Sequence, residues 1–301
     1  MQTPAGSVSD MLRAWGGQVD AALELVISDL GDADPLAPFA QALRYSLLGA
    51  GKRIRPALVL ATAEAFDVAA AQAMPVALAF ELIHAYSLVH DDLPCMDDDD
   101  MRRGRPTSHK VYGEGVATLV GDGLQAEAFA LISSASHIPA QIRTDIVTLL
   151  ATNAGWRGMV GGQYLDIVTG RDASDAAALR DVHSRKTGAL ISAAVQAGAL
   201  IGGADAAARE ACAAFGVSLG WLFQIVDDIL DVVGDGEHMG RPAGSDERHD
   251  KVTALAVFGG VDAARRAADQ ELAYCLELAA RIPNGGGALP AIASFVRTRD
   301  H

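Results

Sequence analysis

The stretch HAYSLVHDDLPCMDDDDMRRGRP occupies residues 84–106 and runs from an apolar helical pattern into a cluster of acids followed by arginines. Pro94 cannot donate a backbone hydrogen bond to the carbonyl of His90, and its ring clashes there, so the helix must kink or end. On an unbroken helix Asp91 and Asp97 would point about 240° apart. A break at Pro94 allows Asp97 to return beside Asp91. The stretch therefore predicts carboxylates gathered at the end of a helix.

A second acidic group, Asp227, Asp228 and Asp231, interrupts the apolar run 223–233. Positions 227 and 231 differ by about 40° on a helix, so two of these carboxylates share one face. Taken alone, such a triplet is equally consistent with a solvated helix end. Within the first cluster, Asp99 and Asp100 are interpreted as a solvated acidic loop.

Several carboxylates on apolar helices need a cation to be stable. Two carboxylates about 4 Å apart repel by roughly 1 kcal/mol in water and about 4 kcal/mol at an effective dielectric of 20. Ligation by carboxylates alone favours Mg²⁺ over zinc. The cysteines, Cys95, Cys212 and Cys275, form no Cys-x-x-Cys pair, so neither a disulfide framework nor a zinc site is indicated. Because the N-terminus also lacks a targeting pattern, we expect a cytoplasmic protein.

The rest of the chain is typical of helices. Ala and Leu dominate, and runs of alternating Val, Ile and Thr are missing. No linker or repeat divides residues 1–301, which predicts one all-α domain, a single large helical bundle. The uncharged stretches 187–204 and 211–226 approach membrane-span length, but Gly, Ser and Gln interrupt both, so we interpret them as buried helices rather than membrane spans. The irregular segment 234–250 is long enough to be functional.

The charge balance excludes one class of partner. The sequence has 24 basic and 38 acidic residues, a net charge of −14, which repels nucleic acids at long range. Some of the basic residues nevertheless stand where a small anion could be gripped, since Arg binds phosphate through two parallel hydrogen bonds. No phosphate loop or Gly-x-Gly-x-x-Gly is present, so a nucleotide is not indicated. These candidate cations are Lys52, Arg55, Arg102, Arg103, Lys186, Arg241 and Lys251.

Together these motifs resemble the short-chain trans-isoprenyl diphosphate synthases, most closely the bacterial farnesyl diphosphate synthases. The matching segments follow the family's order and lie at residues 51–56, 84–94, 96–100, 102–104, 161–166, 186–188 and 223–231. The resemblance implies an all-α isoprenoid-synthase fold with a deep central cavity, a homodimer and two facing aspartate motifs.

The resemblance also implies roles for individual residues. Asp91, Asp97 and Asp227 would hold Mg²⁺, with three ions expected when diphosphate is bound. Supporting catalytic roles fall to Asp92, Asp228, Asp231 and Lys186. The allylic substrate would contact Arg102, Lys186, Thr187, Gln224, Arg241 and Lys251, although the family usually has Lys where this sequence has Arg241. Isopentenyl diphosphate would contact Gly51, Lys52, Arg55, His84 and Arg103.

The activity implied is a head-to-tail condensation of isopentenyl diphosphate with dimethylallyl or geranyl diphosphate, giving farnesyl diphosphate and pyrophosphate. An aromatic residue five positions before the first aspartate marks a farnesyl product in the family, and Tyr86, followed by Ser87, occupies that place. A four-residue spacing between Asp92 and Asp97 points the same way.

Other functions remain open at this point. A geranylgeranyl diphosphate synthase of the same family would differ only in cavity depth. A class I terpene cyclase would not need the 51–56 segment and Arg103, and a non-catalytic synthase subunit tends to lose an aspartate motif.

Overall fold

The computed structural model describes residues 7–27, 34–49, 51–169, 176–233 and 258–299. Apart from one short hairpin, the regular elements among these residues are helices, so the predicted all-α class is confirmed. The chain divides into two compact units, residues 1–57 with 74–136 and residues 58–73 with 137–301. The division falls inside helices α3 (Ile54–Ala65) and α4 (Ala70–Asp91).

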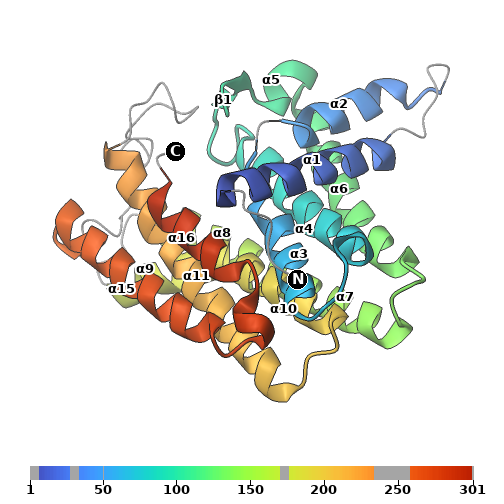
Figure 1. Ribbon diagram of the computed structural model, residues 1–301. Helices are drawn as coiled ribbons and strands as arrows, with labels where there is room; N and C mark the ends of the chain where they lie inside the picture. The colour runs from blue at the N-terminus through green and yellow to red at the C-terminus, as the bar shows by residue number, and fades with distance from the viewer. Residues whose placement is uncertain (1–6, 28–33, 50, 170–175, 234–257, 300–301) are drawn as a thin grey trace. The chain divides into compact units, whose positions relative to one another are not determined.

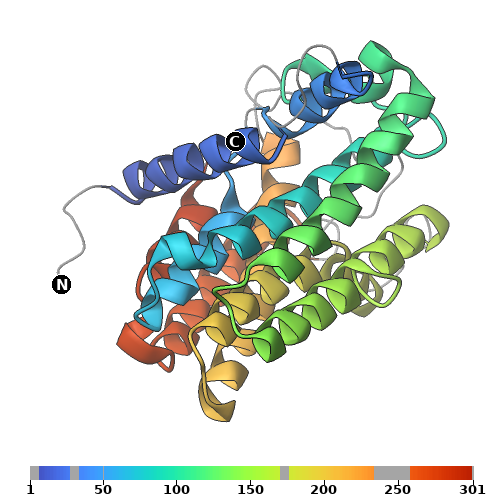
Figure 2. The same ribbon diagram turned by 90° about the vertical axis from the view of Figure 1, so that its right-hand side faces the viewer.

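The first unit is built around amphipathic and buried helices. Its α1 (Val8–Ile27) begins with a reciprocal cap, in which the Ser7 amide donates to Asp10 Oδ2 and the Asp10 amide donates to Ser7 Oγ. Every third or fourth residue of α1 is buried, which gives the helix one apolar stripe. Figure 2 shows α2 (Ala37–Leu47) beside α5 (Ser108–Tyr112) and one end of α6 (Glu114–Ser134).

A short antiparallel hairpin lies between α4 and α5. Strands β1 (Met101–Arg102) and β2 (Arg105–Pro106) pair Arg102 with Arg105 across the ladder. Both loop residues, Arg103 and Gly104, have positive φ, at 52° and 75°, as tight two-residue hairpin loops require. The sequence shows no strand pattern here, because the pairing follows from the loop geometry rather than from β-branched residues.

The second unit centres on α11 (Ala206–Val233), which packs along α10 (Ala189–Ile201) and α15 (Val261–Ala279), with α16 (Leu289–Thr298) against both α11 and α15 (Figure 1). A Cβ on Gly220 would lie 2.6 Å from the Gly188 Cα, so glycine permits this close approach. The remaining elements are α7 (Ala140–Ala154), α8 (Met159–Thr169), α9 (Ala176–His183), a π-helical turn (Ser184–Gly188) and a 3-10 turn (Pro283–Gly286).

Helices α4, α6 and α11 are long and apolar enough to cross a membrane, judged by length and composition alone. The predicted stretch 187–204 extends from the π-helical turn into α10, and the stretch 211–226 lies within α11. In the most apolar 18-residue part of each helix, more than half of the residues are buried in α4 and in α11, and 33% are buried in α6. The predicted functional loop 234–250 lies outside the described residues.

Candidate active site

The first acidic cluster forms where α4 ends. The helix stops at Asp91, before Pro94, as the ring of the proline requires. The chain then folds back, so that the Asp97 amide donates to the Asp91 carbonyl at 2.9 Å and the Asp98 amide donates to the Leu93 carbonyl at 3.1 Å. This turn places Asp97 beside Asp91, and both side chains are half-buried.

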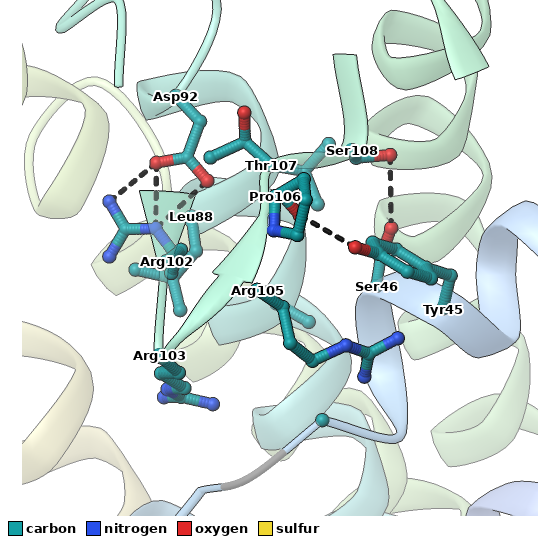
Figure 3. A pocket seen from close by; sticks show the side chains of 13 residues that line it. Tyr45, Ser46, Leu88, Asp92, Arg102, Arg103, Arg105, Pro106, Thr107 and Ser108 are labelled. Atoms are coloured by element: carbon teal, nitrogen blue, oxygen red, sulfur yellow. Dashed lines mark hydrogen bonds and ion pairs between the residues drawn. The ribbon is translucent and has the colours of Figure 1, made fainter. Parts of the chain in front are cut away.

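Asp92 is held by an arginine of the hairpin. Arg102 Nε donates to both carboxylate oxygens of Asp92, at 2.6 and 2.8 Å, as Figure 3 shows. Asp92 is 3% exposed, and this burial raises its pKa to about 7 despite the facing guanidinium. Strand β1 therefore presents a cation to the acidic cluster.

A third group of donor atoms lies close to this cluster. Ligand atoms of Asp98, Asp100 and His109 all lie within 4.8 Å of one another, and Asp100 also pairs with Lys110 Nζ at 2.6 Å. The sequence indicates only a solvated acidic loop at Asp100, and no local spacing connects it with His109. His109 enters it only because the hairpin returns the chain.

Of the residues predicted to bind isopentenyl diphosphate, Arg55 and Arg103 lie close enough to His84 to affect its charge. The pKa of His84 lies well below its ordinary value because of desolvation and the nearby charges of Arg55 and Arg103. A Cβ on Gly51 would lie 2.6 Å from Arg103 Nη1, so only glycine lets this guanidinium approach the backbone so closely. Lys52 and Arg55 are half-buried. A neutral imidazole among arginines is suited to an anion.

Arg103 also contributes to a pocket that is lined in part by the hairpin (Figure 3). Its wall includes Arg105, whose guanidinium carbon lies 4.1 Å from the ring centroid of Tyr45. The Tyr45 hydroxyl donates to the Pro106 carbonyl at 2.7 Å and fastens the hairpin to α2. Arg102 and Arg103 also line the pocket, together with Asp92, so its arginines outnumber its carboxylates.

Arg53 has a structural role that the sequence does not indicate. It adopts a positive φ of 48° and is 4% exposed. Its guanidinium donates to Glu81 Oε1 at 2.5 Å, to Asp20 Oδ1 at 2.8 Å and to the Leu47 carbonyl at 2.7 Å. Because Arg53 lies between Lys52 and Arg55, these bonds fix the backbone that carries both. The sequence shows it only as one more basic residue.

In the second unit, α8 packs directly on the turn that carries Lys186. Lys186 Nζ lies 2.7 Å from Asp166 Oδ2, and a Cβ on Gly162 would collide with the Lys186 backbone nitrogen. The turn itself is π-helical, a form that occurs often at functional sites. Gln163 is 8% exposed, and its amide atoms have no hydrogen-bond partner within the described parts of the chain.

The second acidic cluster is connected to the same turn. Thr187 Oγ1 donates to Gln224 Oε1 at 3.2 Å, and Gln224 Nε2 donates to Asp228 Oδ1 at 2.8 Å. Asp228 and Asp231 are buried, whereas the Asp227 side chain is 47% exposed. Gln224, itself held by Thr187, thus orients the Asp228 carboxylate, and Asp227 is the most exposed carboxylate of the cluster.

Asp227 is paired with a residue that no motif indicated. Arg299 Nη2 lies 2.5 Å from Asp227 Oδ1. Arg299 follows α16 and stands far from the aspartate motif in the sequence, so no local signal connects them. Two predicted contacts with the allylic substrate, Arg241 and Lys251, lie outside the described residues.

The two residues predicted to set chain length lie one helical turn before the first cluster. Tyr86 is 5% exposed, and its ring meets the His90 ring edge-on at a centroid distance of 5.8 Å. Burial raises the pKa of the Tyr86 phenol, so the hydroxyl stays neutral. Ser87 Oγ donates to the His84 carbonyl at 2.9 Å.

An all-α fold with two acidic clusters at helix ends, each beside lysines or arginines, is the arrangement expected of a metal-dependent enzyme that acts on diphosphates. The polyprenyl synthetase family model matches residues 37–280, and the chain belongs to this family.

Several known proteins are similar over most of the chain. A farnesyl diphosphate synthase of Geobacillus stearothermophilus is 43% identical, over 98% of this chain and 99% of that protein. A chloroplastic geranylgeranyl pyrophosphate synthase of Catharanthus roseus is 41% identical, over 87% of this chain and 74% of that protein. The solved structure of an FPP/GFPP synthase from Zymomonas mobilis matches with a TM-score of 0.85 at 32% identity, covering 97% of this chain and 99% of that one.

Proposed function

We propose that this chain is a farnesyl diphosphate synthase, a prenyltransferase that condenses isopentenyl diphosphate with dimethylallyl or geranyl diphosphate. The observation that carries the proposal is the cationic patch around His84, with Gly51, Arg55 and Arg103. A chain-elongating synthase needs this second diphosphate site, whereas a terpene cyclase does not. Both aspartate motifs are intact, which argues against a non-catalytic subunit.

The residues divide the chemistry between them. Asp91, Asp97 and Asp227 offer hard oxygen donors that fit Mg²⁺. When bound there, Mg²⁺ would neutralise the negative charge that develops on the departing diphosphate. Arg102 and Lys186 add fixed positive charge for the same anion. The allylic C–O bond breaks, and its electron pair leaves with the diphosphate.

The second substrate then reacts with the allylic cation. Arg55 and Arg103 hold isopentenyl diphosphate, whose double bond attacks the cationic carbon and forms the new C–C bond. One proton leaves the adduct to the released pyrophosphate and restores a double bond. The neutral imidazole of His84 orients the second diphosphate without adding charge. Apolar helices exclude water, which would convert the cation into an alcohol.

The assembly and location of the protein are also proposals. A single synthase domain spanning residues 1–301 is supported by the family match, which extends across both compact units. The family resemblance supports a soluble cytoplasmic homodimer, and light scattering of the purified protein would test the dimer.

The decisive experiment incubates the purified protein with labelled isopentenyl diphosphate, each allylic starter and Mg²⁺, followed by dephosphorylation and chromatography of the alcohols. We expect farnesol as the main product from dimethylallyl and geranyl diphosphates. A predominance of geranylgeraniol would favour the longer-chain synthase. Cyclic hydrocarbons made from the starter alone would indicate a cyclase, and no elongation with any starter would reject the proposal.

A further inference from the structure

The Arg299 side chain is enclosed against the last turns of α11. Its Nη2 donates to Asp227 Oδ1 at 2.5 Å and to the Phe223 carbonyl at 3.0 Å. Its guanidinium carbon lies 3.8 Å from the centroid of the Phe223 ring. Although Arg299 is the last described residue, its side chain is only 6% exposed.

These contacts fix the guanidinium rather than leaving it to move in solvent. Phe223 and Asp227 are one helical turn apart, so they lie on one face of α11, and the arginine bridges them. The backbone amide of Arg299 donates to the Phe295 carbonyl at 3.0 Å and fixes the approach from α16. An exposed ion pair would lack the ring and the carbonyl contact.

Arg299 pairs with a carboxylate that the proposed function assigns to a metal. Asp227 is the most exposed carboxylate of the second cluster. A metal ion at Asp227 Oδ1 would need an M–O distance of about 2.1 Å, and the Arg299 Nη2 atom at 2.5 Å from the same oxygen competes for its lone pairs. Two positive groups this close also repel.

We propose that Arg299 is a built-in countercharge that occupies Asp227 in the metal-free protein and competes with the divalent ion. The proposal rests on the proposed function. Arg299 is a positioning residue in this account, because it acts through Asp227 and not on the substrate. It offsets the charge of Asp227 before metal binds and weakens the metal affinity of this half of the site.

The test measures metal binding to the full chain without substrate, with Mn²⁺ as the probe and electron paramagnetic resonance of free Mn²⁺ as the readout. We expect Arg299→Gln to bind Mn²⁺ about threefold to tenfold more tightly than wild type at the site that Asp227→Asn removes. Arg299→Lys keeps the positive charge but lacks the forked guanidinium. Its Mn²⁺ affinity should lie between those of wild type and Arg299→Gln. The matched control is Arg297→Gln, two residues earlier and within α16, because Arg297 Nε pairs with Asp269 Oδ1 at 2.7 Å, away from Asp227, and its loss should leave metal affinity unchanged.

A second readout separates competition from a loss of fold. Without metal, Arg299→Gln should unfold at a lower temperature than wild type. Saturating Mn²⁺ should reduce this difference in unfolding temperature. Equal or weaker Mn²⁺ binding by a folded Arg299→Gln variant, at a site that Asp227→Asn removes, overturns the inference and leaves the proposed function standing. If Arg299→Gln does not fold, wild-type affinity in Arg299→Lys overturns it. If no variant shows a site that depends on Asp227, the metal role of Asp227 and this inference both fall.

Discussion

Arg53 and Glu81 form a buried ion pair, with Arg53 Nη1 2.5 Å from Glu81 Oε1 and side chains only 2% and 3% exposed. Desolvation acts to lower the pKa of Arg53, but the charges of Glu81 and Asp20 outweigh it, so the pKa is raised and the arginine stays charged. Glu81 stands one turn before His84 on α4. The pair therefore joins the segment that carries Lys52 to the helix that carries His84.

Breaking this pair should destabilise the protein strongly. Arg53→Met leaves the Glu81 charge buried without its main partner, and we expect a loss of about 3 to 5 kcal/mol in the free energy of unfolding. The double variant Arg53→Met with Glu81→Leu should recover much of that loss in stability. The KM for isopentenyl diphosphate should be higher than in wild type for both variants, because the bonds that fix the backbone of Lys52 and Arg55 are lost. Chemical denaturation and steady-state kinetics measure both effects.

A half-exposed pair provides the control. Arg44 lies 3.0 Å from Glu24, with 32% and 47% of their side chains exposed, so Arg44→Met should cost less than about 1 kcal/mol. Equal losses for Arg44→Met and Arg53→Met would contradict the importance assigned to the buried pair.

His84 should make folding sensitive to acid. Its pKa is lowered in the folded protein, so the unfolded chain binds the proton better, and stability is fully present above about pH 6.5 and falls below it. Between pH 7.5 and 5.5, wild type should lose about 1 kcal/mol more than His84→Gln. Denaturant titrations of both proteins at the two pH values measure this. Parallel pH profiles would show that His84 does not titrate in this way.

Tyr86→Ala should lengthen the product. Leu82, one turn earlier on the same face of α4, lines a largely apolar pocket of about 340 Å³, and we expect removal of the Tyr86 ring to open space toward it. We expect alcohols longer than fifteen carbons after dephosphorylation, with a stability loss of about 3 kcal/mol. Tyr86→Phe keeps the ring and should keep the product length. An unchanged product from the alanine variant would remove Tyr86 from chain-length control.

Asp91→Ala and Asp227→Ala should each lower kcat by orders of magnitude, because each removes a carboxylate that we assign to Mg²⁺. Their circular dichroism spectra should match wild type, since Asp91 ends α4, Asp227 lies near the end of α11, and both side chains are only partly buried. Asp269→Ala removes a surface carboxylate, 63% exposed, and serves as the control. Near-normal turnover in either variant would contradict the metal assignment.

Gly162→Ala should impair the allylic half of the site. The new Cβ would collide with the Lys186 backbone nitrogen, so α8 and the π-helical turn must separate, and the 2.7 Å contact between Lys186 and Asp166 is strained. We expect at least a tenfold loss in kcat/KM for the allylic substrate. Gly17→Ala places its Cβ in open space on α1 and should leave kinetics unchanged, with a gain of up to about 1 kcal/mol in stability. Normal kinetics for Gly162→Ala would show that the turn tolerates the displacement.

The local sequence determined the all-α class and the break after Asp91, because helix propensity and the missing donor of Pro94 act over a few residues. The motif order was sufficient to recognise the family that the comparisons show. The positions of the two aspartate groups could likewise be stated from the sequence. Their ligand roles remain predictions.

Only the tertiary structure decided which charges are buried and which partners they have. In the sequence Arg53 is one basic residue among several. Its burial against Glu81 depends on how α1 and α4 pack. The pairing of Arg299 with Asp227 joins residues that share no local pattern. The cost of a charge depends on its surroundings in space, and those surroundings come from long-range packing that no spacing along the chain specifies.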